Sequence, residues 1–289
     1  MKATILNGTL FVGEECDDVS LSASDRGFLL GDGLFETLPV LHGAPLWWQE
    51  HSARLTQSAN RLGMSLDPIM LEHTVSQLAA LSKETNTILR IAVSRGSGGR
   101  GLLPPVEARP TLLATLASLP DGLAFQDMSL ATSTIRRNAQ SLTASIKSNN
   151  YLDNIAAAQQ AEQAGASDAL LLNTEGKIAC TTIGNLFSLH GSCLTTPPVS
   201  DGVLPGIVRQ QLLTLAPQWG FEATEASLSS EDVKKADGLF MTNSLRFIRR
   251  VTAWDDHAYT AAPDDPISQL QTHMRDHVAK LTGVTIGHL

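Results

Sequence analysis

Hydrophobic residues recur along this chain with two periods, and the period predicts which kind of element each segment forms. Alternating apolar positions predict strands that bury one face, whereas apolar positions three and four residues apart predict amphipathic helices. In the first part of the chain these patterns predict a hairpin around Asn7-Gly8, a strand over 35–40, helices over 47–62 and 68–82, and strands over 88–94 and 111–116. An Asn-Gly pair between two apolar runs is a strong signal for a tight hairpin turn.

The same patterns restart after a short segment that contains proline and glycine, residues 119–124. Beyond it they predict strands over 128–134, 169–173, 185–189 and 239–242, and helices over 151–164, 205–215, 229–236 and 265–281. Because strands and helices are mixed on both sides of this break, we predict an α+β protein with two lobes. The expected boundaries are an N-terminal lobe over 1–118, a linker over 119–124 and a C-terminal lobe over 125–289.

The composition restricts the class of protein. A length of 289 residues suits one large domain or two ordinary ones. The hydrophobic content of 43% and the charged content of 17% exclude a disordered chain, a collagen and a coiled coil. A net charge of −8 argues against a nucleic-acid partner, since nucleic-acid binders normally carry a basic surplus. An anionic small molecule is compatible with this charge, because a site can be locally positive.

Other features argue against a membrane protein and a metal site. No apolar run approaches the ~18 residues of a membrane-spanning helix. The N-terminal apolar stretch is interrupted by Asn7-Gly8 and followed by acidic residues, so we expect no signal peptide and a cytoplasmic protein without a membrane partner. The three cysteines (Cys16, Cys180 and Cys193) contain no CxxC pair, and the eight histidines contain no HExxH motif. We therefore expect neither a disulfide framework nor a bound metal.

Two cationic residues are candidates for chemistry. Lys147 follows a strand-like stretch, precedes a helix and is flanked by Ile146 and Tyr151. Apolar surroundings lower the pKa of a lysine and make its amine a nucleophile, although most lysines in loops are simply solvated. Arg54 lies within a predicted helix, where it would be either a surface residue or a phosphate ligand, because a guanidinium matches the geometry of a phosphate.

Two further segments are candidates for binding an anion. Residues 204–209 (LPGIVR) open a helix after a Pro-Gly turn, and the N–H groups of Ile207 and Val208 would point at a ligand. Residues 242–245 (TNSL) follow a strand, and they would either hydrogen-bond a phosphate or only form a turn. An amine, a guanidinium, a helix N-terminus and a hydroxyl-rich turn together form the set that pyridoxal phosphate requires.

Seven motifs follow one another along the chain: DRGFLLGDGLFET (25–37), HSARL (51–55), RGSGGRG (95–101), IKSNNYLDN (146–154), GNLF (184–187), LPGIVR (204–209) and TNSL (242–245). In these motifs and their order the sequence resembles the class IV, or fold type IV, pyridoxal-phosphate enzymes. That family contains branched-chain aminotransferases, D-amino-acid aminotransferases and 4-amino-4-deoxychorismate lyases. The resemblance implies a two-lobed α+β fold with a small N-terminal α/β lobe and a larger, β-barrel-like C-terminal α/β lobe that carries the cofactor lysine. It also implies a homodimer that binds pyridoxal 5'-phosphate and an amino-acid-like substrate.

The resemblance also assigns roles to individual residues. Lys147 would be the catalytic lysine, which binds the cofactor and moves the α-proton of the substrate. Arg54 would bind the cofactor phosphate, and Tyr151 would lie on the side of the ring hydroxyl. The remaining cofactor-binding residues would be Cys180, Ile207, Val208, Thr242 and Asn243.

Cys180 departs from the family pattern. The family has a glutamate that faces the pyridine nitrogen, five residues before the Asn of the GNLF motif, and Cys180 occupies that position here. A carboxylate keeps the ring nitrogen protonated, whereas a neutral thiol does not. We therefore expect a weaker electron sink that favours elimination over transamination, unless Glu175 or another acid takes over the role or the alignment slips by one residue.

The substrate side differs from the family at two further positions. Leu30 stands where a tyrosine is common, and Leu102 follows the glycine-rich loop where a tyrosine is usual. The RGSGGRG and TNSL motifs are most similar to those of the deoxychorismate lyases, whose substrate carries two carboxylates. Arg95 or Arg100 would bind one of them, although an arginine in such a loop is equally often only solvated.

Three functions follow from the resemblance. The first is a lyase that converts 4-amino-4-deoxychorismate to 4-aminobenzoate and pyruvate, a reaction of folate biosynthesis that is driven by aromatisation of the ring. The second is an aminotransferase of branched-chain or D-amino acids. The third is a weakly active homologue that binds pyridoxal phosphate.

Overall fold

The computed structural model of the chain describes residues 2–260 and 265–284. Contacts divide these residues into two compact units. The first unit contains residues 2–120, 147–150 and 281–284, and the second contains 121–146 and the described part of 151–280. The first break, after residue 120, lies within the linker predicted over 119–124. The predicted lobes also include residues 1, 261–264 and 285–289, which lie outside the described residues.

The first unit contains an antiparallel six-stranded sheet in the order β2-β1-β6-β5-β3-β4. Its strands are β1 (Ala3–Leu6), β2 (Thr9–Val12), β3 (Gly33–Leu41), β4 (Ala44–Pro45), β5 (Asn86–Ser94) and β6 (Thr111–Ser118). The predicted hairpin is confirmed, because β1 and β2 pair directly and the turn residues Asn7 and Gly8 have φ angles of 48° and 87°. The strands predicted over 35–40, 88–94 and 111–116 lie within β3, β5 and β6.

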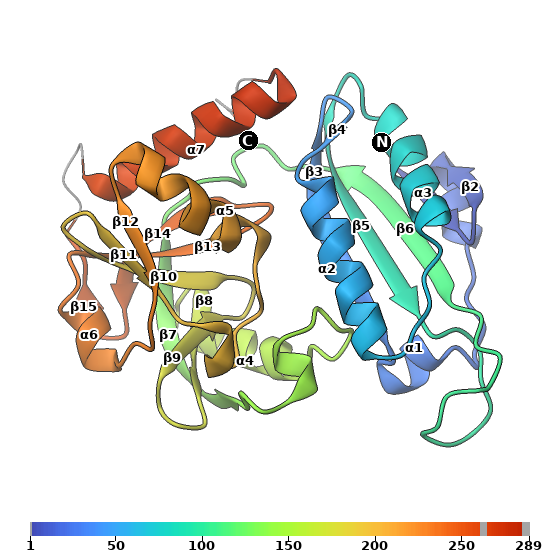
Figure 1. The fold of residues 1–289 in the computed structure, drawn as a ribbon, viewed down its shortest axis with the longest axis horizontal. Helices are drawn as coiled ribbons and strands as arrows, with labels where there is room; N and C mark the ends of the chain where they lie inside the picture. Colours follow the sequence, from blue (N-terminus) through green and yellow to red (C-terminus); the bar gives the residue numbers. More distant parts are fainter. Residues whose placement is uncertain (1, 261–264, 285–289) are drawn as a thin grey trace. The chain divides into compact units, whose positions relative to one another are not determined.

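Two helices, α2 (Trp48–Arg61) and α3 (Pro68–Ala80), cover one face of this sheet (Figure 1). Both confirm the predicted helices and end within two residues of the predicted bounds. The start of α3 is set by Asp67, whose carboxylate accepts hydrogen bonds from two backbone N–H groups of the first turn. The unit also contains α1 (Arg26–Leu30) and a short 3₁₀ helix (Gly13–Asp18), which the sequence patterns did not predict.

A short segment around Lys147 pairs with the edge of β3 that β5 leaves open. The N–H of Phe35 donates to the carbonyl of Lys147, and the N–H of Asn149 donates to the carbonyl of Gly33, both at 2.9 Å. A Cβ at Gly33 would lie 2.6 Å from the Asn149 amide, so this approach requires glycine. These contacts group residues 147–150 with the first unit, whereas the boundaries predicted from the sequence place the lysine in the lobe over 125–289.

The second unit contains a nine-stranded sheet that closes on itself. The closed ring runs through β10, β13, β14, β7, β8 and β9, and β9 pairs back to β10 where Cys180 lies opposite Asn185. The strands are β7 (Met128–Arg137), β8 (Asp168–Asn173), β9 (Ile178–Thr181), β10 (Asn185–His190), β11 (Cys193–Thr196), β12 (Glu222–Glu225), β13 (Gly238–Asn243), β14 (Phe247–Trp254) and β15 (His257–Ala258). A buried apolar cluster from six of these strands, which includes Leu130, Leu186 and Met241, forms the core of the unit. This closed sheet confirms the predicted α+β fold with a β-barrel-like part.

The helices of the second unit are α4 (Leu152–Gln163), α5 (Ile207–Leu215), α6 (Ser230–Lys234) and most of α7 (Pro266–Thr282), with short 3₁₀ helices at Leu142–Ala144, Val199–Asp201 and Ala216–Trp219. All four α-helices were predicted. Strands β9, β11, β12, β14 and β15 were not predicted. Every residue of β9 is buried, so the alternation that identifies a strand is absent there. Within the described ranges, no helix is both long and apolar enough to cross a membrane.

Candidate active site

Lys147 lies beside an aromatic ring that a second cation also contacts. Because Lys147 pairs with Phe35 across the edge of β3, both side chains lie on the same face of the sheet, and the Lys147 Nζ is 4.2 Å from the centre of the Phe35 ring. Arg90 reaches the same ring from β5, with its guanidinium carbon 3.8 Å from the ring centre. The negative face of an aromatic ring attracts cations, so Phe35 holds both groups in place.

The surroundings of Lys147 favour an uncharged amine. Burial lowers the pKa of Lys147 from 10.5 to about 8, and the positive charges of Arg54 and Arg90 act in the same direction. Glu36 opposes them, because its negative charge favours the protonated amine. A lysine with this pKa is roughly one tenth uncharged at neutral pH, several hundred times more than a solvated lysine. Its environment is therefore that of an amine nucleophile rather than that of a solvated loop lysine.

Arg54 is held by a carboxylate that the sequence analysis did not single out. Glu36 is completely buried on β3, and it accepts hydrogen bonds from the Arg54 Nε at 2.8 Å and the Arg54 Nη2 at 2.6 Å. The second oxygen also lies 2.7 Å from the Nδ1 of His51, which is equally buried one turn before Arg54 on α2. The GLFET and HSARL motifs contain these residues, but only the fold brings them together.

The contacts within this cluster determine which of its side chains are charged. Burial alone would raise the pKa of Glu36, but Arg54 and His51 outweigh it and lower that pKa to about 2. Burial lowers the pKa of His51 below its usual value, so the imidazole is neutral at neutral pH and its Nδ1–H donates to Glu36. The cluster therefore consists of one anion, one cation and one neutral donor.

In the second unit, the start of α5 lies next to an unsatisfied hydroxyl. The helix begins at Ile207, and its N-cap Gly206 supplies no side-chain cap. The first N–H groups of a helix have no partner within the helix, and they form a natural site for an anion. Thr242 lies opposite Asn185 in the sheet, and a Cβ at Gly206 would lie 1.9 Å from the Asn185 amide oxygen. The register therefore brings Thr242 close to the start of α5.

The hydroxyl of Thr242 is buried and has no hydrogen-bond partner within the described residues. A buried polar group is normally hydrogen-bonded in proteins, so this hydroxyl could donate to a ligand bound at this position. A phosphate accepts hydrogen bonds from hydroxyl and backbone N–H groups, and the first residues of α5, Ile207 and Val208, are both buried at this point. The residues present therefore fit the phosphate of a bound cofactor.

Unlike the hydroxyl of Thr242, the side chain of Asn243 has hydrogen-bond partners. Its side-chain oxygen accepts hydrogen bonds from the backbone N–H of Leu245 and Arg246, at 3.1 and 2.7 Å. Its amide donates to the carbonyl of Ile183 at 3.3 Å. The side chain thus forms the turn after β13 and ties it to the segment that precedes β10.

Cys180 lies at the point where the sheet closes, and it is buried. Burial raises the pKa of its thiol, so the group is neutral, although Arg137 acts in the opposite direction. Glu175 is exposed in the turn between β8 and β9. Asp168 is a buried acid whose charge reaches Cys180, and its Oδ1 accepts a hydrogen bond from the Thr182 hydroxyl at 2.5 Å. Asp168 is therefore a buried acid of this unit whose charge acts on Cys180.

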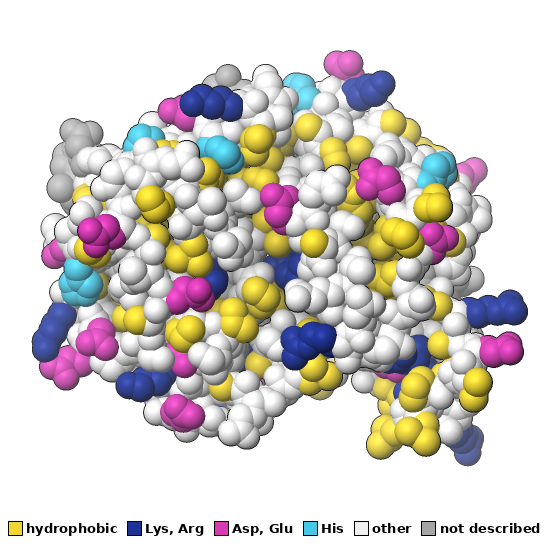
Figure 2. Space-filling model, viewed as in Figure 1, with side chains coloured by type: hydrophobic (Ala, Val, Ile, Leu, Met, Phe, Trp, Pro, Cys, Tyr) yellow, Lys and Arg dark blue, Asp and Glu magenta, His cyan; other side chains and the backbone are white. Residues whose placement is uncertain are grey.

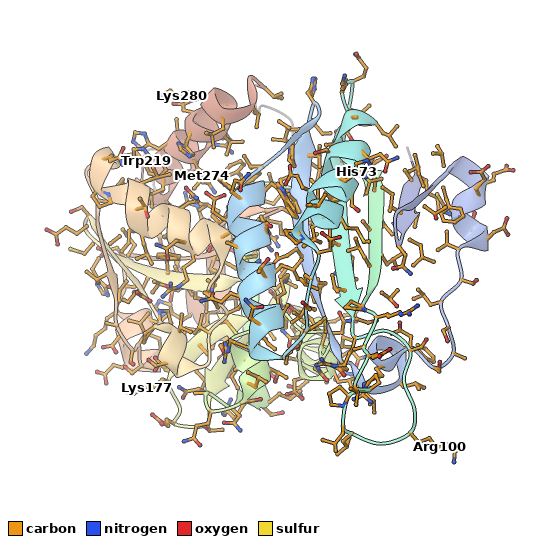
Figure 3. The ribbon with its side chains drawn as sticks, turned by 45° about the vertical axis from the view of Figure 1, so that its right-hand side comes forward. His73, Arg100, Lys177, Trp219, Met274 and Lys280 are labelled. Carbon is orange, nitrogen blue, oxygen red and sulfur yellow. The ribbon has the colours of Figure 1, made fainter. Side chains whose placement is uncertain are left out.

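The two arginines of the glycine-rich loop have different environments. Arg95 is buried, and its three nitrogens donate to the carboxylate of Asp32 and to the carbonyls of Leu62 and Gly63. These contacts give Arg95 a structural role in holding the loop. Arg100 is exposed on the loop between β5 and β6, and its side chain points away from the sheet (Figure 3). Of the two arginines predicted to bind a substrate carboxylate, Arg100 therefore stays a prediction, whereas the contacts of Arg95 point to a structural role.

The two remaining site predictions concern residues with different exposure. Leu30 is exposed at the end of α1, and Tyr151 is partly buried at the start of α4. Within residues 2–260 and 265–284, no three His, Cys, Asp or Glu side chains are grouped to hold a metal ion.

Known proteins are similar to this chain in sequence and in fold. Residues 33–254 match the family described as Amino-transferase class IV. The chain is 33% identical over 243 residues to a putative branched-chain-amino-acid aminotransferase of Methanocaldococcus jannaschii, which covers 83% of each chain. It is 29% identical over 266 residues to an aminodeoxychorismate lyase of Bacillus subtilis, which covers 88% of each chain.

Solved structures are similar to this chain in fold. A putative 4-amino-4-deoxychorismate lyase of Legionella pneumophila matches with a TM-score of 0.82 and 31% identity, over 90% of this chain and 95% of that one. The pyridoxal-phosphate-bound form of a hypothetical aminotransferase from Mycobacterium tuberculosis shares the fold, with a TM-score of 0.81 and 24% identity over 99% of both chains. Fold and donor groups together define an enzyme that uses pyridoxal phosphate. The chain belongs to the class IV aminotransferase family, whose members depend on this cofactor.

Proposed function

We propose that the protein is a pyridoxal-phosphate-dependent lyase that converts 4-amino-4-deoxychorismate to 4-aminobenzoate and pyruvate. The observation that carries this choice is the buried, neutral thiol of Cys180, which stands where the family has a glutamate. Formation of the aromatic product drives this elimination, so it needs less electron withdrawal than amino transfer does. The lyase relative from Bacillus subtilis and the Legionella structure support the same choice.

The proposed cofactor site uses the groups described above. Lys147 binds the cofactor covalently, and Arg54 binds its phosphate. In the second unit, the proposed phosphate donors are the backbone N–H groups of Ile207 and Val208 and the hydroxyl of Thr242. The other members of the proposed site are Tyr151 on the side of the ring hydroxyl, Cys180 at the ring nitrogen and Asn243 in the turn that supports the phosphate.

Bound pyridoxal phosphate supplies an aldehyde that reacts with amines and a ring that withdraws electrons from the carbon attached to that nitrogen. The amine of Lys147, with a pKa of about 8, accepts the α-proton of the substrate and carries it for the later steps. Arg90 and Arg100 supply positive charge for the two substrate carboxylates. Arg90 was not predicted from the sequence, and its support is its position on the same Phe35 ring as Lys147. The apolar side chain of Leu30 contributes to the substrate side.

A homodimer is supported by an exposed apolar surface in the first unit. The side chains of this surface are exposed on α1 and on the loop between β5 and β6, and they are Phe28, Leu29, Leu30, Leu102, Leu103 and Val106 (Figure 2). Arg26 fixes the loop, because its guanidinium donates to the carbonyls of Gly101 and Leu102 at 3.0 and 2.8 Å. Contiguous apolar surfaces of this kind are typical of protein–protein interfaces. We propose that a second copy of the chain covers this surface.

An aminotransferase is the second candidate function. The relative from Methanocaldococcus jannaschii, at 33% identity, favours it. The buried acid Asp168 favours it too, because a carboxylate near the ring nitrogen would strengthen the electron sink.

The two functions are separated by one set of assays on the purified protein with bound cofactor. A lyase forms 4-aminobenzoate from 4-amino-4-deoxychorismate without an amino acceptor. An aminotransferase changes the cofactor absorbance when a branched-chain or D-amino acid is added alone. We expect the first result, and absence of product in a protein that holds the cofactor overturns the lyase proposal. Absence of both results identifies the weakly active homologue.

A further inference from the structure

Glu36 is a buried anion that the proposed reaction does not use. Its carboxylate lies in the middle of β3, completely buried, with all its described side-chain contacts to α2. A buried carboxylate is tolerated only when it is paired and hydrogen-bonded, so the contacts to Arg54 and His51 account for its presence. They do not account for why this position of the fold carries a charge at all, since apolar residues fill such positions elsewhere in β3, at Leu34 and Leu38.

The contact between Glu36 and Arg54 fixes the orientation of the arginine. Two nitrogens of one edge of the guanidinium donate to the two carboxylate oxygens, at 2.8 and 2.6 Å. A two-point contact of this type defines both the position and the plane of the guanidinium. An arginine held in this way loses less freedom when a ligand binds than an arginine with many rotamers does. His51 holds the carboxylate in turn, with its Nδ1 at 2.7 Å.

Glu36 also acts on Lys147, which pairs with the preceding residue of β3. The charged and titratable groups that act on the lysine come from three elements: Glu36 from β3, Arg54 and His51 from α2, and Arg90 from β5. Glu36 raises the pKa of Lys147, whereas Arg54 and Arg90 lower it. The Glu36 carboxylate therefore contacts Arg54 directly. At the Lys147 amine, its negative charge opposes the positive charge of Arg54.

We propose that Glu36 is a positioning residue of the cofactor site, which orients the Arg54 guanidinium for the phosphate and couples that arginine to the Lys147 amine. The inference rests on the proposed function, because it takes Arg54 as the phosphate ligand and Lys147 as the cofactor lysine. Coupling of this kind is reciprocal: an anion bound at Arg54 offsets its charge and favours the protonated lysine, and protonation of the lysine favours the anion.

The first test compares two aldehydes that differ only in the phosphate, pyridoxal 5'-phosphate and pyridoxal. Each is titrated into cofactor-free protein and followed by absorbance at about pH 9, where the lysine is mostly uncharged. Glu36→Gln keeps the shape of the side chain and removes its charge. We expect the preference for the phosphorylated aldehyde to fall about tenfold, the loss expected when a charge-assisted contact no longer holds the arginine. Glu72→Gln, which removes an exposed carboxylate from α3, should leave the preference unchanged.

An unchanged preference in Glu36→Gln overturns the positioning role. An increased preference overturns it as well, because it would mean that Glu36 acts mainly by repelling the phosphate. The sign of the change thus separates orientation from simple electrostatics.

The second test follows the lysine, and a purely structural role of Glu36 would not affect it. The pH dependence of pyridoxal binding reports the titration of Lys147 without a phosphate. We expect its midpoint to fall by about half a pH unit or more in Glu36→Gln and not to change in Glu72→Gln. In the wild-type protein, saturating inorganic phosphate should raise the midpoint. This measurement needs no folded variant, and an unmoved midpoint overturns the coupling.

The outcomes distinguish this inference from the proposed function. If the wild-type protein gives no absorbance change with pyridoxal phosphate, or if Lys147→Ala gives the same change, the assignment of the cofactor lysine fails. If that assignment holds and Glu36→Gln behaves like Glu72→Gln in both tests, only the role of Glu36 fails.

Discussion

We expect Lys147 to lower the stability of the cofactor-free protein, and its replacement by methionine should reveal by how much. Methionine has a side chain of similar length and keeps the contact with Phe35, since sulfur packs well against aromatic rings. It removes an amine that is costly to charge in this environment, next to Arg54 and Arg90. We therefore expect Lys147→Met to be inactive and, at neutral pH, more stable than the wild-type protein.

The pKa of Lys147 sets the size of this effect. Its lowering from 10.5 to about 8 corresponds to at most about 3 kcal/mol of unfavourable free energy for the charged form. Screening of a partly exposed group reduces this value to roughly half. Methionine also loses the contact between the lysine cation and the Phe35 ring, which reduces the expected gain by about a further 0.5 kcal/mol. The expected gain in the free energy of unfolding is thus about 1 kcal/mol.

The size of this stabilisation depends on pH. The unfolded chain keeps the lysine proton up to its ordinary pKa of 10.5, whereas the folded protein loses it at about 8. Between these values the unfolded state binds more protons, so the stability of the wild-type protein rises with pH. The advantage of Lys147→Met is therefore complete below about pH 8 and disappears as the pH approaches 10.5.

Urea denaturation of the cofactor-free proteins at about pH 7 and about pH 10 measures both effects. Lys83→Met, which changes an exposed lysine of the first unit, serves as the control and should show no pH-dependent difference. A Lys147→Met protein that is less stable at both pH values, or one whose advantage is the same at both, would refute the reasoning.

Five further substitutions test other parts of the account. Cys180→Glu should increase amino transfer relative to elimination and shift the cofactor absorbance, because it restores a charge at the ring; an unaltered spectrum shows that Cys180 does not face the ring. Arg95→Ala should lower the free energy of unfolding by about 3 kcal/mol, since it breaks a buried ion pair, whereas Arg100→Ala should raise KM about tenfold without changing Tm; equal effects on KM would contradict this division. Thr242→Val should weaken pyridoxal phosphate binding about tenfold and change the stability of the cofactor-free protein by less than about 1 kcal/mol, because the hydroxyl has no partner to lose within the described residues; undiminished affinity would remove it from the site. Leu103→Asp should convert the dimer to monomers in sedimentation, and a protein that is monomeric before substitution contradicts the proposed interface.

Helices with one apolar face and most of the longer apolar stretches could be predicted from the sequence, whereas several short strands and a strand interrupted by charges could not. The helix α2 has a clear apolar face, and its bounds were predicted to within one residue. The strand β9 is buried throughout, and β14 has two arginines next to each other between its apolar residues, so neither shows a simple alternation. The closing contact between β9 and β10 is a single pair of residues, which no local pattern predicts.

Side chains that carry a motif could also be predicted, but their partners could not. Lys147 and Arg54 lie within recognisable motifs, whereas the contact between Glu36 and Arg54 joins residues 18 positions apart on a strand and a helix. Arg95 shows that a motif does not by itself define the role of its side chain. An arginine in a glycine-rich loop has the same sequence surroundings whether it binds a substrate or holds the loop, and only its contacts to the carbonyls of Leu62 and Gly63 distinguish the two.

The central claim is that Lys147 binds pyridoxal phosphate covalently. Reduction of the protein–cofactor complex with borohydride makes such a bond permanent, and mass spectrometry of the digested protein then locates it. We predict one added cofactor per chain, on the peptide that contains Lys147, and none in Lys147→Ala. A cofactor attached to a different lysine, or none in a protein that retains the cofactor's absorbance, would contradict the account.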